Sequence, residues 1–217
     1  MGEQRKTRAV LIGAAPGQRL DYLLPMLRED DFVICADGGR NKADSAGIKA
    51  DWYVGDNDSG GSPEGLPCTI LPSEKDVTDM EMAIDQAFAL GYREMLLAGC
   101  TGGREDHHVA NLGLLEQIWT RGGVAVLVNE ENEVRFLSPG SYQIENEPAF
   151  YYLSLLPLDA VVSGVTLRGT KYELTDAQIR RGTTLAVSNE ILQGKTAEIA
   201  IESGCALLIR SQRMTNN

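Results

Sequence analysis

Short apolar runs alternate with segments of helical periodicity over the first part of the chain, from Arg8 to about Asn129. The runs RAVLIG, DFVICAD, EMLLAG and VAVLVN have the length and apolar character of buried strands. Between them, LDYLLPMLRE and HVANLGLLEQIW repeat apolar residues at the spacing of an amphipathic helix. This alternation predicts a parallel sheet with helices on both faces, the doubly wound, Rossmann-like arrangement of α/β domains.

The clearest helix is predicted to begin at Thr78. Apolar residues recur after it at helical spacing, and Gly91 supplies a stop. The apolar positions are Met80, Ala83, Ile84, Ala87 and Phe88. We therefore expect one face of this helix to pack on the sheet.

The pattern of predicted elements changes after the charged stretch EENE at Glu130 to Glu133, from alternating strands and helices to strands alone. Strand candidates with glycine-containing turns between them follow, namely EVRFL, YQIE, FYYLSLL, AVVSGVTL, TLAVS, AEIAIE and ALLIRS. This pattern predicts an all-β sandwich. With the boundary near Asn132, we expect an α/β domain over residues 1–132 and a β-sandwich domain over residues 133–217.

The net charge limits the partners of this chain. Its 217 residues hold 20 Lys and Arg against 31 Asp and Glu, so the formal net charge is −11. Such an acidic protein is not expected to bind nucleic acid or an anionic membrane. If it binds a polyphosphate, a divalent metal and local donors such as backbone amides must relieve the repulsion.

The cysteines and the apolar stretches indicate where the protein works. Its four cysteines are widely spaced, without a C-x-x-C pair, and are read as reduced thiols of the core. They are Cys35, Cys68, Cys100 and Cys205. No apolar stretch approaches the roughly 20 residues of a membrane helix, and the start of the chain shows no export signal. We expect a soluble cytoplasmic protein.

Polar segments follow the predicted strands and precede the predicted helices at four places. In a doubly wound sheet, ligands bind beyond the carboxyl ends of the strands, so these segments are expected to meet at one edge. The four segments are Asp37-Gly38-Gly39, Gly55-Asp56-Asn57-Asp58-Ser59, Lys75-Asp76-Val77-Thr78-Asp79 and Thr101-Gly102-Gly103-Arg104-Glu105-Asp106-His107.

Three aspartates in these segments have the pattern of a magnesium site. Asp56 and Asp58 lie two residues apart beside a glycine, so an extended backbone aims both carboxylates at one hard cation. Asp79 is placed to complete the cage from a neighbouring loop. The alternative is an ordinary turn, since Gly-Asp-Asn-Asp-Ser-Gly-Gly is also typical of surface loops.

The start of the predicted helix at Thr78 has two readings. Thr78 and Glu81 match the T-x-x-E capping box, which explains both residues without a ligand. Asp79 in the first turn suits the helix dipole. Lys75, Asp76 and Asp79 together also suit a site for a cation and a phosphate.

The segment after MLLAGC is expected to open a helix and to approach a phosphate. Small residues at Gly102 and Gly103 let backbone amides come close, and Arg104 adds a forked donor. Asp106 is read either as a ligand contact or as a simple N-cap.

Two histidines and an asparagine in and after this segment are further candidates for ligand contacts. His107 and His108 are adjacent and lack the i, i+4 spacing of a helical metal pair, so neither is read as a zinc ligand. Asn111 on the predicted helix is expected either to reach a nucleotide or to be a surface amide.

Taken in order, ADGG, GDNDS, KDVTDME, GGREDH with ANL shortly after, and VSNE resemble the motif series of the thiamine pyrophosphokinases of the bacterial type. The resemblance runs over most of the chain. It implies an ATP-binding α/β domain, a thiamine-binding C-terminal β-sandwich, and a homodimer whose active sites lie between subunits. ATP is then the co-substrate and Mg²⁺ the cofactor.

The resemblance also implies site residues. Asp56, Asp58 and Asp79 match the metal-binding and catalytic carboxylates, and Tyr172 stands where the family places an aromatic residue that stacks on thiamine. Ser188 and Asn189 match the rest of the thiamine site. The alternative interpretation of Tyr172 is a strand residue that covers the core. The nucleotide contacts that we predict are Asp37, Gly38, Gly39, Lys75, Thr78, Gly102, Gly103, Arg104, Asp106, His107 and Asn111.

The sequence departs from the family pattern at Asn57, where the family generally has a bulky apolar residue between the two aspartates. The implied reaction places the thiamine hydroxyl in line with the β-phosphorus of ATP, while a carboxylate such as Asp56 accepts the proton. Two alternatives remain: a diphosphokinase for another hydroxymethyl compound such as a pterin, and a non-catalytic nucleotide or thiamine sensor.

Overall fold

The computed structural model describes residues 7–17, 19–56, 65–70 and 76–213. The chain forms two compact units, Met1–Glu130 and Glu131–Asn217, each described here by itself. The change of pattern along the sequence near Asn132 falls beside this division.

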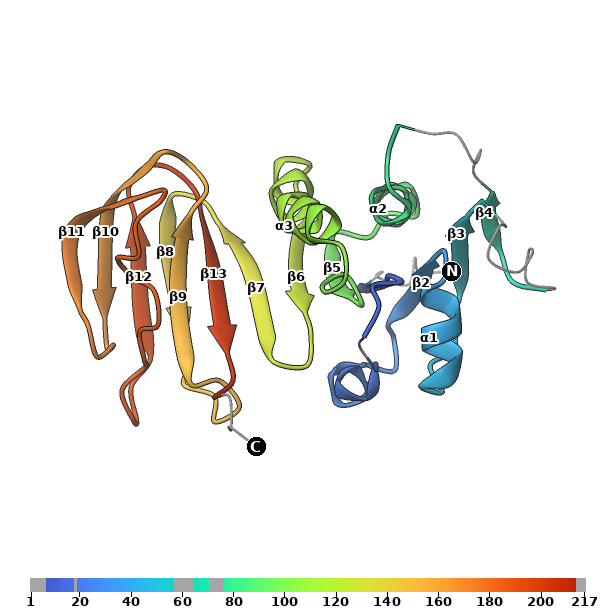
Figure 1. Ribbon diagram of the computed structural model, residues 1–217, viewed down its shortest axis with the longest axis horizontal. Helices are drawn as coiled ribbons and strands as arrows, with labels where there is room; N and C mark the ends of the chain where they lie inside the picture. The colour runs from blue at the N-terminus through green and yellow to red at the C-terminus, as the bar shows by residue number, and fades with distance from the viewer. Residues whose placement is uncertain (1–6, 18, 57–64, 71–75, 214–217) are drawn as a thin grey trace, which may run out of the picture. The chain divides into compact units, whose positions relative to one another are not determined.

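The first unit contains a parallel sheet, as predicted. Its strands are β1 (Ala9–Ile12), β2 (Phe32–Ala36), β3 (Trp52–Gly55), β4 (Cys68–Ile70), β5 (Glu94–Ala98) and β6 (Val124–Val128). They lie in the order β4-β3-β2-β1-β5-β6 (Figure 1). All neighbours are parallel, and Ile12 at the end of β1 pairs with Cys35 of β2 and Ala98 of β5. The chain therefore reverses its direction of travel across the sheet between β1 and β5.

Helices cover both faces of this sheet. They are the 3₁₀ helix η1 (Asp21–Met26), α1 (Gly39–Ser45), α2 (Asp79–Ala89) and α3 (Glu105–Thr120). One core joins the strand residues Val10 and Ile12 with Leu23 of η1 and Ala43 of α1. Since strand side chains alternate, the intervening Leu11 faces the opposite side, and α2 packs against β1, β2 and β3. Figure 1 shows α2 and α3 on one face of the sheet and α1 on the other.

Two helix predictions had different outcomes. The helix predicted from Thr78 is α2, and its stripe from Met80 to Ala87 is buried as expected. The segment LDYLLPMLRE forms only the short 3₁₀ helix η1, which contains Pro25. A proline lacks the backbone donor and its ring clashes with the preceding turn, so it opposes an α-helix there.

The second unit contains antiparallel sheet. Its strands are β7 (Asn132–Leu137), β8 (Gly140–Ile144), β9 (Tyr152–Pro157), β10 (Val161–Arg168), β11 (Leu174–Arg180), β12 (Ala197–Ile201) and β13 (Ala206–Ser211). β13 pairs with β7 and β9, and a separate sheet has the order β11-β10-β12-β8. Leu155 of β9, Leu208 of β13 and Leu167 of β10 share one core, so side chains of both sheets pack together.

Two strand assignments in this unit were wrong. TLAVS is not a strand but a loop, in which Ala186 and Ser188 have positive φ angles of 69° and 56°. Strands do not accommodate such angles. β11, with the sequence LTDAQIR, was missed because Ile179 is its one fully buried residue and most of its other side chains are exposed.

The structure can be compared with the expectations for the cysteine thiols and for membrane-spanning helices. Cys35 and Cys100 are buried, and burial raises the pKa of each thiol to about 12. Cys68 and Cys205 are only half-buried, so the expectation of four core thiols is wrong for these two. Within the described ranges, none of the helices is both long and apolar enough to cross a membrane.

Candidate functional site

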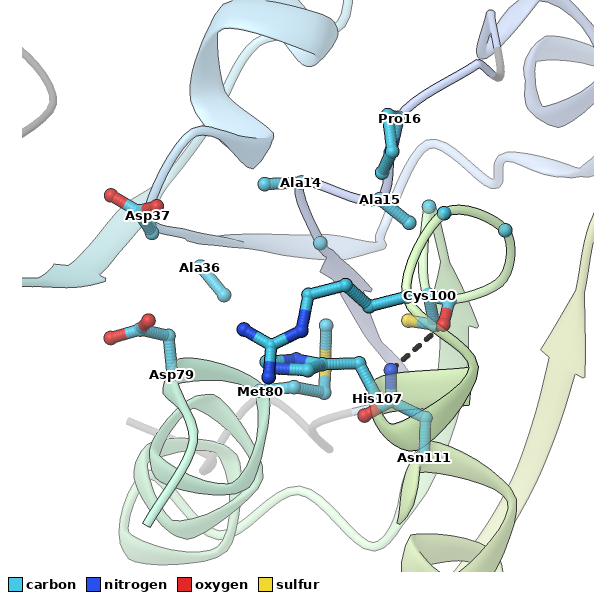
Figure 2. A pocket seen from close by; sticks show the side chains of 15 residues that line it. Ala14, Ala15, Pro16, Ala36, Asp37, Asp79, Met80, Cys100, His107 and Asn111 are labelled. Atoms are coloured by element: carbon cyan, nitrogen blue, oxygen red, sulfur yellow. Dashed lines mark hydrogen bonds between the residues drawn. The ribbon is translucent and has the colours of Figure 1, made fainter. Parts of the chain in front are cut away.

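A pocket of about 400 Å³ lies at the carboxyl ends of the strands in the first unit (Figure 2). Its walls are residues 13–16 after β1, residues 36–37 at the end of β2, residues 79–80 at the start of α2, and parts of the segment 99–111 after β5. The strands that flank the reversal point between β1 and β5 thus both end at this pocket. This is the place where ligands bind in open α/β sheets.

The loop after β1 and the turn after β5 are joined through their backbones. The Gly13 amide donates to the Ala98 carbonyl (2.8 Å), and the Ala15 amide donates to the Gly99 carbonyl (2.9 Å). A Cβ on Gly13 would lie 2.7 Å from the Gly99 oxygen, and one on Gly99, whose φ is +64°, would lie 2.5 Å from the Gly13 oxygen. Only glycine therefore fits at both positions, and it keeps this wall of the pocket thin.

The two glycines before α3 have backbone angles that favour glycine. Gly102 and Gly103 have φ angles of +94° and +75°, and a Cβ on Gly103 would collide with the ring of Pro16. Both glycines line the pocket just before α3 begins at Glu105. Their small size brings the main chain to the pocket surface.

Asp37 carries an unpaired acceptor in the pocket wall. It follows β2 with a positive φ of 45°, and its amide donates to the Val54 carbonyl (2.8 Å). Its Oδ1 is buried and has no hydrogen-bond partner among the residues that the structure describes. A buried oxygen without a partner costs free energy, so this atom is suited to accept a donor from a ligand.

The predicted metal-binding aspartates are only partly described. Asp79 is the first residue of α2 and lines the pocket, on the same side as Asp37 in Figure 2. Asp56 directly follows β3 and is half-buried, but it is not part of the lining. Asp58 lies outside the described residues, as does Lys75. Within the described ranges, no three His, Cys, Asp or Glu residues form a metal-binding group.

Thr78 acts as a helix cap. Its Oγ1 accepts from the Glu81 amide (3.3 Å), while the Glu81 carboxylate accepts from Gln117 Nε2 (2.7 Å). Only the threonine half of the predicted capping box is therefore observed. Thr78 does not line the pocket, unlike its neighbour Asp79.

Arg104 and Asp106 form a surface pair at the start of α3. The guanidinium donates to both carboxylate oxygens, at 3.1 and 2.6 Å, and Asp106 also accepts from the His107 amide (2.9 Å). Hydrogen bonds from Arg104 and this amide lower the pKa of Asp106 to about 2, and the same pairing raises the pKa of Arg104. The N-cap is Arg104, so reading Asp106 as an N-cap was wrong.

Asn111 lines the pocket and is hydrogen-bonded to the segment that follows β5. Its side chain is buried, and its Nδ2 donates to the Cys100 carbonyl (2.8 Å), the dashed line in Figure 2. The reading of Asn111 as a surface amide is therefore wrong. His107, one turn earlier on α3, is exposed and lines the pocket.

Sequence reasoning missed the small and apolar wall residues. Ala14, Ala15 and Pro16 after β1, Ala36 in β2 and Met80 in α2 all line the pocket but carry no polar side chain. The available signal was position, because GAAPG directly follows the first predicted strand as ADGG follows the second. Gly38 and Gly39 do not line the pocket, but a Cβ on Gly39 would collide with the Ile12 carbonyl, so this glycine lets α1 approach β1.

A second hollow, of about 250 Å³, lies in the second unit. It is lined by Tyr172, Leu174, residues 184–187 and Asn189. Tyr172 stands in the loop between β10 and β11 and is 60% exposed, so the alternative of a core-covering strand residue is wrong. The Lys171 ammonium lies 5.6 Å from the centre of its ring. A large exposed aromatic side chain of this kind is available to a ligand.

Ser188 and Asn189 differ in their surroundings. Ser188 is exposed, and its amide donates to Ser154 Oγ (2.9 Å). Asn189 is 1% exposed, and its side chain bonds to the backbone of Tyr172. Asn189 therefore has much less freedom to meet a ligand than Ser188.

Comparison with known proteins assigns a class to each unit. Residues 23–127 match the catalytic domain of thiamin pyrophosphokinase, and residues 141–206 match the vitamin B1 binding domain of the same enzyme. The curated thiamine pyrophosphokinase of Bacillus subtilis is 32% identical over 142 residues, which span 65% of this chain and 66% of that protein.

Solved structures agree with the sequence matches. The thiamine pyrophosphokinase of B. subtilis aligns with a TM-score of 0.87 at 28% identity, over 96% of this chain and 100% of that one. The thiamin pyrophosphokinase of Geobacillus thermodenitrificans aligns with a TM-score of 0.84 at 31% identity, over 96% and 99% of the two chains. The chain belongs to the thiamin pyrophosphokinase family, which confirms the family predicted from the motifs.

Proposed function

We propose that this protein transfers the terminal diphosphate of ATP to the hydroxyl of thiamine, giving thiamine diphosphate and AMP. The observation that carries the proposal is the presence in one chain of both family domains, each with a hollow formed by residues of the predicted site. The activity requires both, since one substrate supplies the diphosphate and the other receives it.

ATP is assigned to the pocket of the first unit, which we treat as a Rossmann-like nucleotide-binding domain. The strand order with its reversal beside β1 supports this assignment. The glycines at 102 and 103 allow main-chain amides to approach phosphate oxygens at the start of the 16-residue helix α3. The unpaired Asp37 oxygen is suited to accept a hydroxyl or amino donor of the nucleotide.

Arg104, Lys75 and His107 are assigned to the polyphosphate. Arg104 is already paired with Asp106 on the surface, so a phosphate must share the guanidinium or displace the carboxylate. An arginine fork with five donors has the capacity to share.

Asp56, Asp58 and Asp79 are assigned to Mg²⁺. The carboxylate of Asp79 at the pocket wall is a hard oxygen donor and fits this ion, which needs only one or two protein carboxylates beside phosphate and water. Bound Mg²⁺ would neutralise charge on the polyphosphate, which a chain with a net charge of −11 otherwise repels.

Thiamine is assigned to the second-unit hollow. The exposed ring of Tyr172 offers a face for the cationic vitamin, and Ser188 is exposed in the loop between two residues that line the hollow, Val187 and Asn189. In the reaction, the protein must hold the thiamine hydroxyl in line with the β-phosphorus, and we assign acceptance of its proton to Asp56.

The protein is also proposed to be a cytoplasmic homodimer with active sites shared between subunits. Exposed apolar residues of the second unit, including Leu185, Val187 and Leu192, offer surface for a second copy. Mixing an inactive Asp56→Asn chain with a Tyr172→Ala, Asn189→Ala chain, and assaying at a thiamine concentration far below the raised KM of the second chain, should restore about a quarter of wild-type activity after unfolding and refolding. Confirmed subunit exchange without recovered activity would rule out the shared site.

The test of the proposed function is AMP formation from ATP, with and without thiamine. Thiamine-dependent AMP is expected, and a hydroxymethyl pterin in place of thiamine should give none. AMP with the pterin alone would favour the alternative diphosphokinase. Saturable binding of thiamine without AMP would favour a sensor.

A further inference from the structure

The side-chain amide of Asn189 holds the backbone of another residue. Asn189 Oδ1 accepts from the Tyr172 amide (3.0 Å), and Asn189 Nδ2 donates to the Tyr172 carbonyl (2.7 Å). The same Oδ1 also accepts from the Glu190 amide (2.9 Å). Two acceptances match the two lone pairs of an amide oxygen, so the acceptor capacity of Asn189 is used inside the protein.

Asn189 is itself fixed to the sheet. Its amide donates to the Leu153 carbonyl (2.9 Å), and its carbonyl accepts from the Leu153 amide (2.8 Å). Leu153 belongs to β9 and is 1% exposed. The chain of contacts therefore runs from a buried strand through Asn189 to the backbone of Tyr172.

The ring of Tyr172 is exposed, and the Lys171 ammonium lies 5.6 Å from its centre. It is 60% exposed, in a loop outside the strands. Besides Asn189, the Tyr172 carbonyl accepts a longer bond from Thr170 Oγ1 (3.3 Å). Both backbone groups of Tyr172 thus bond to Asn189, which holds the backbone from which the ring extends. The loop has further backbone bonds on either side of Tyr172, from the Lys171 amide to the Glu190 carbonyl (2.9 Å) and from the Leu192 amide to the Gly169 carbonyl (3.0 Å).

We propose that Asn189 is a positioning residue, which prepares the thiamine site by holding Tyr172 in place rather than by contacting thiamine. The inference rests on the proposed function of the hollow. Holding an exposed ring in its binding position before the ligand arrives reduces the conformational freedom lost on binding. Both bonds go to the backbone of residue 172. Asn189 therefore holds this backbone in the same way when another side chain stands at position 172.

The test is a double-mutant cycle on thiamine affinity. Asn189→Ala is expected to weaken thiamine binding about ten-fold, from the loss of the hydrogen bonds that order the loop. In a Tyr172→Ala background, the same change should alter affinity less than about two-fold, because the ring that Asn189 positions is already absent. A direct ligand contact would instead give the same loss in both backgrounds and would overturn the proposal.

A matched control is available in Asn146. Its Nδ2 donates to the carbonyls of Ile191 (3.5 Å) and Leu192 (3.2 Å), next to the segment that holds Tyr172 but not to Tyr172 itself. Asn146→Ala is expected to leave thiamine affinity unchanged. If Asn189→Ala does not fold, Asn189→Asp replaces the donor to the Tyr172 carbonyl with a charged carboxylate oxygen while keeping the acceptor for the Tyr172 amide, and its loss of affinity should show the same dependence on Tyr172.

Hydrogen exchange tests, without any ligand, whether the hydrogen bonds of Asn189 order the backbone of Tyr172. In the free protein, Asn189→Ala should speed exchange in the loop 169–173 and leave residues 9–12 of the first unit unchanged. Unchanged exchange in the loop would overturn the proposal. If the protein lacks thiamine-dependent activity, this measurement still decides whether Asn189 orders Tyr172, so the two failures can be told apart.

Discussion

The pocket of the first unit is walled mainly by main chain and small side chains, whereas the hollow of the second unit is walled by larger side chains carried on loops. In the pocket, Gly13 and Gly99 touch through their backbones, beside the ends of regular strands. In the hollow, Tyr172 and residues 184–187 stand on loops, two of whose non-glycine residues, Ala186 and Ser188, have positive φ. Backbone contacts therefore fix the shape of the first-unit pocket. The second-unit hollow instead depends on side-chain hydrogen bonds, such as those of Asn189, to hold its loops.

The largest effect is expected from Asp79 in the pocket. Asp79→Asn should lower turnover about 100-fold or more, because it removes charge where the polyphosphate and its metal are assigned. The free energy of unfolding should fall by at most about 1 kcal/mol, the worth of one charge at a helix N-terminus. AMP release and thermal melts would be measured together.

A control for this change lies on the same helix. Asp85 pairs with Arg121 (2.6 Å) away from the pocket, so Asp85→Asn should leave turnover intact. Asp56→Asn and Asp58→Asn are expected to resemble Asp79→Asn. Near-normal turnover in all three variants would contradict the assignment of these aspartates to the metal and the polyphosphate.

The backbone construction of the pocket is tested at Gly103. Gly103→Ala adds a methyl group that collides with Pro16, and the displaced wall should raise the KM for ATP about ten-fold with little change for thiamine. Gly122→Ala is matched in backbone strain, with φ of +76° against +75°, but its Cβ meets nothing within 4 Å. An equal rise in KM for both variants would mean that strain, rather than the pocket wall, is responsible.

The side-chain construction of the hollow is tested at Tyr172. Tyr172→Ala should weaken thiamine binding by about 0.5–2 kcal/mol, the worth of a cation on an aromatic face, and leave the KM for ATP unchanged. Tyr172→Phe keeps the ring and should retain most of the affinity. A parallel loss of ATP and thiamine affinity in Tyr172→Ala would show that the two hollows are not independent.

The smallest effect on ligands is expected at Thr78, which the sequence assigned to the nucleotide. Thr78→Ala should cost about 1 kcal/mol of stability through the lost helix cap, with both KM values nearly unchanged. Thr78→Ser should restore the stability. A selective rise in the KM for ATP would return Thr78 to the nucleotide site.

Regular elements were predictable where burial dominates the sequence. β1 reads AVLI and is fully buried, and α2 repeats its apolar residues on one face. β11 was missed because most of its side chains are exposed, and TLAVS was mistaken for a strand because its composition favours β structure while its backbone does not. Positive φ at Ala186 and Ser188 comes from tertiary contacts, which composition does not record.

The candidate site was predictable through its polar residues and through the glycine pair at 102 and 103. Asp37, Asp79 and Arg104 stand at strand and helix ends, where sequence alone suggested chemistry, and the structure brings them to one pocket. Ala14, Ala15 and Met80 share that pocket without any polar signal. The role of Asn189 was out of reach for a different reason, because an amide that serves the backbone and an amide that serves a ligand look alike in a sequence.

The contact between Gly13 and Gly99 restricts how this pocket can change during evolution. Neither glycine can gain a side chain without displacing the other, so single substitutions there are expected to be purged. Variation in the choice of nucleotide is expected instead at positions whose side chains line the pocket without an assigned polar role, such as Ala14, Ala36 and Met80. A library aimed at accepting a different nucleotide should therefore randomise these three positions and keep the glycine pair fixed.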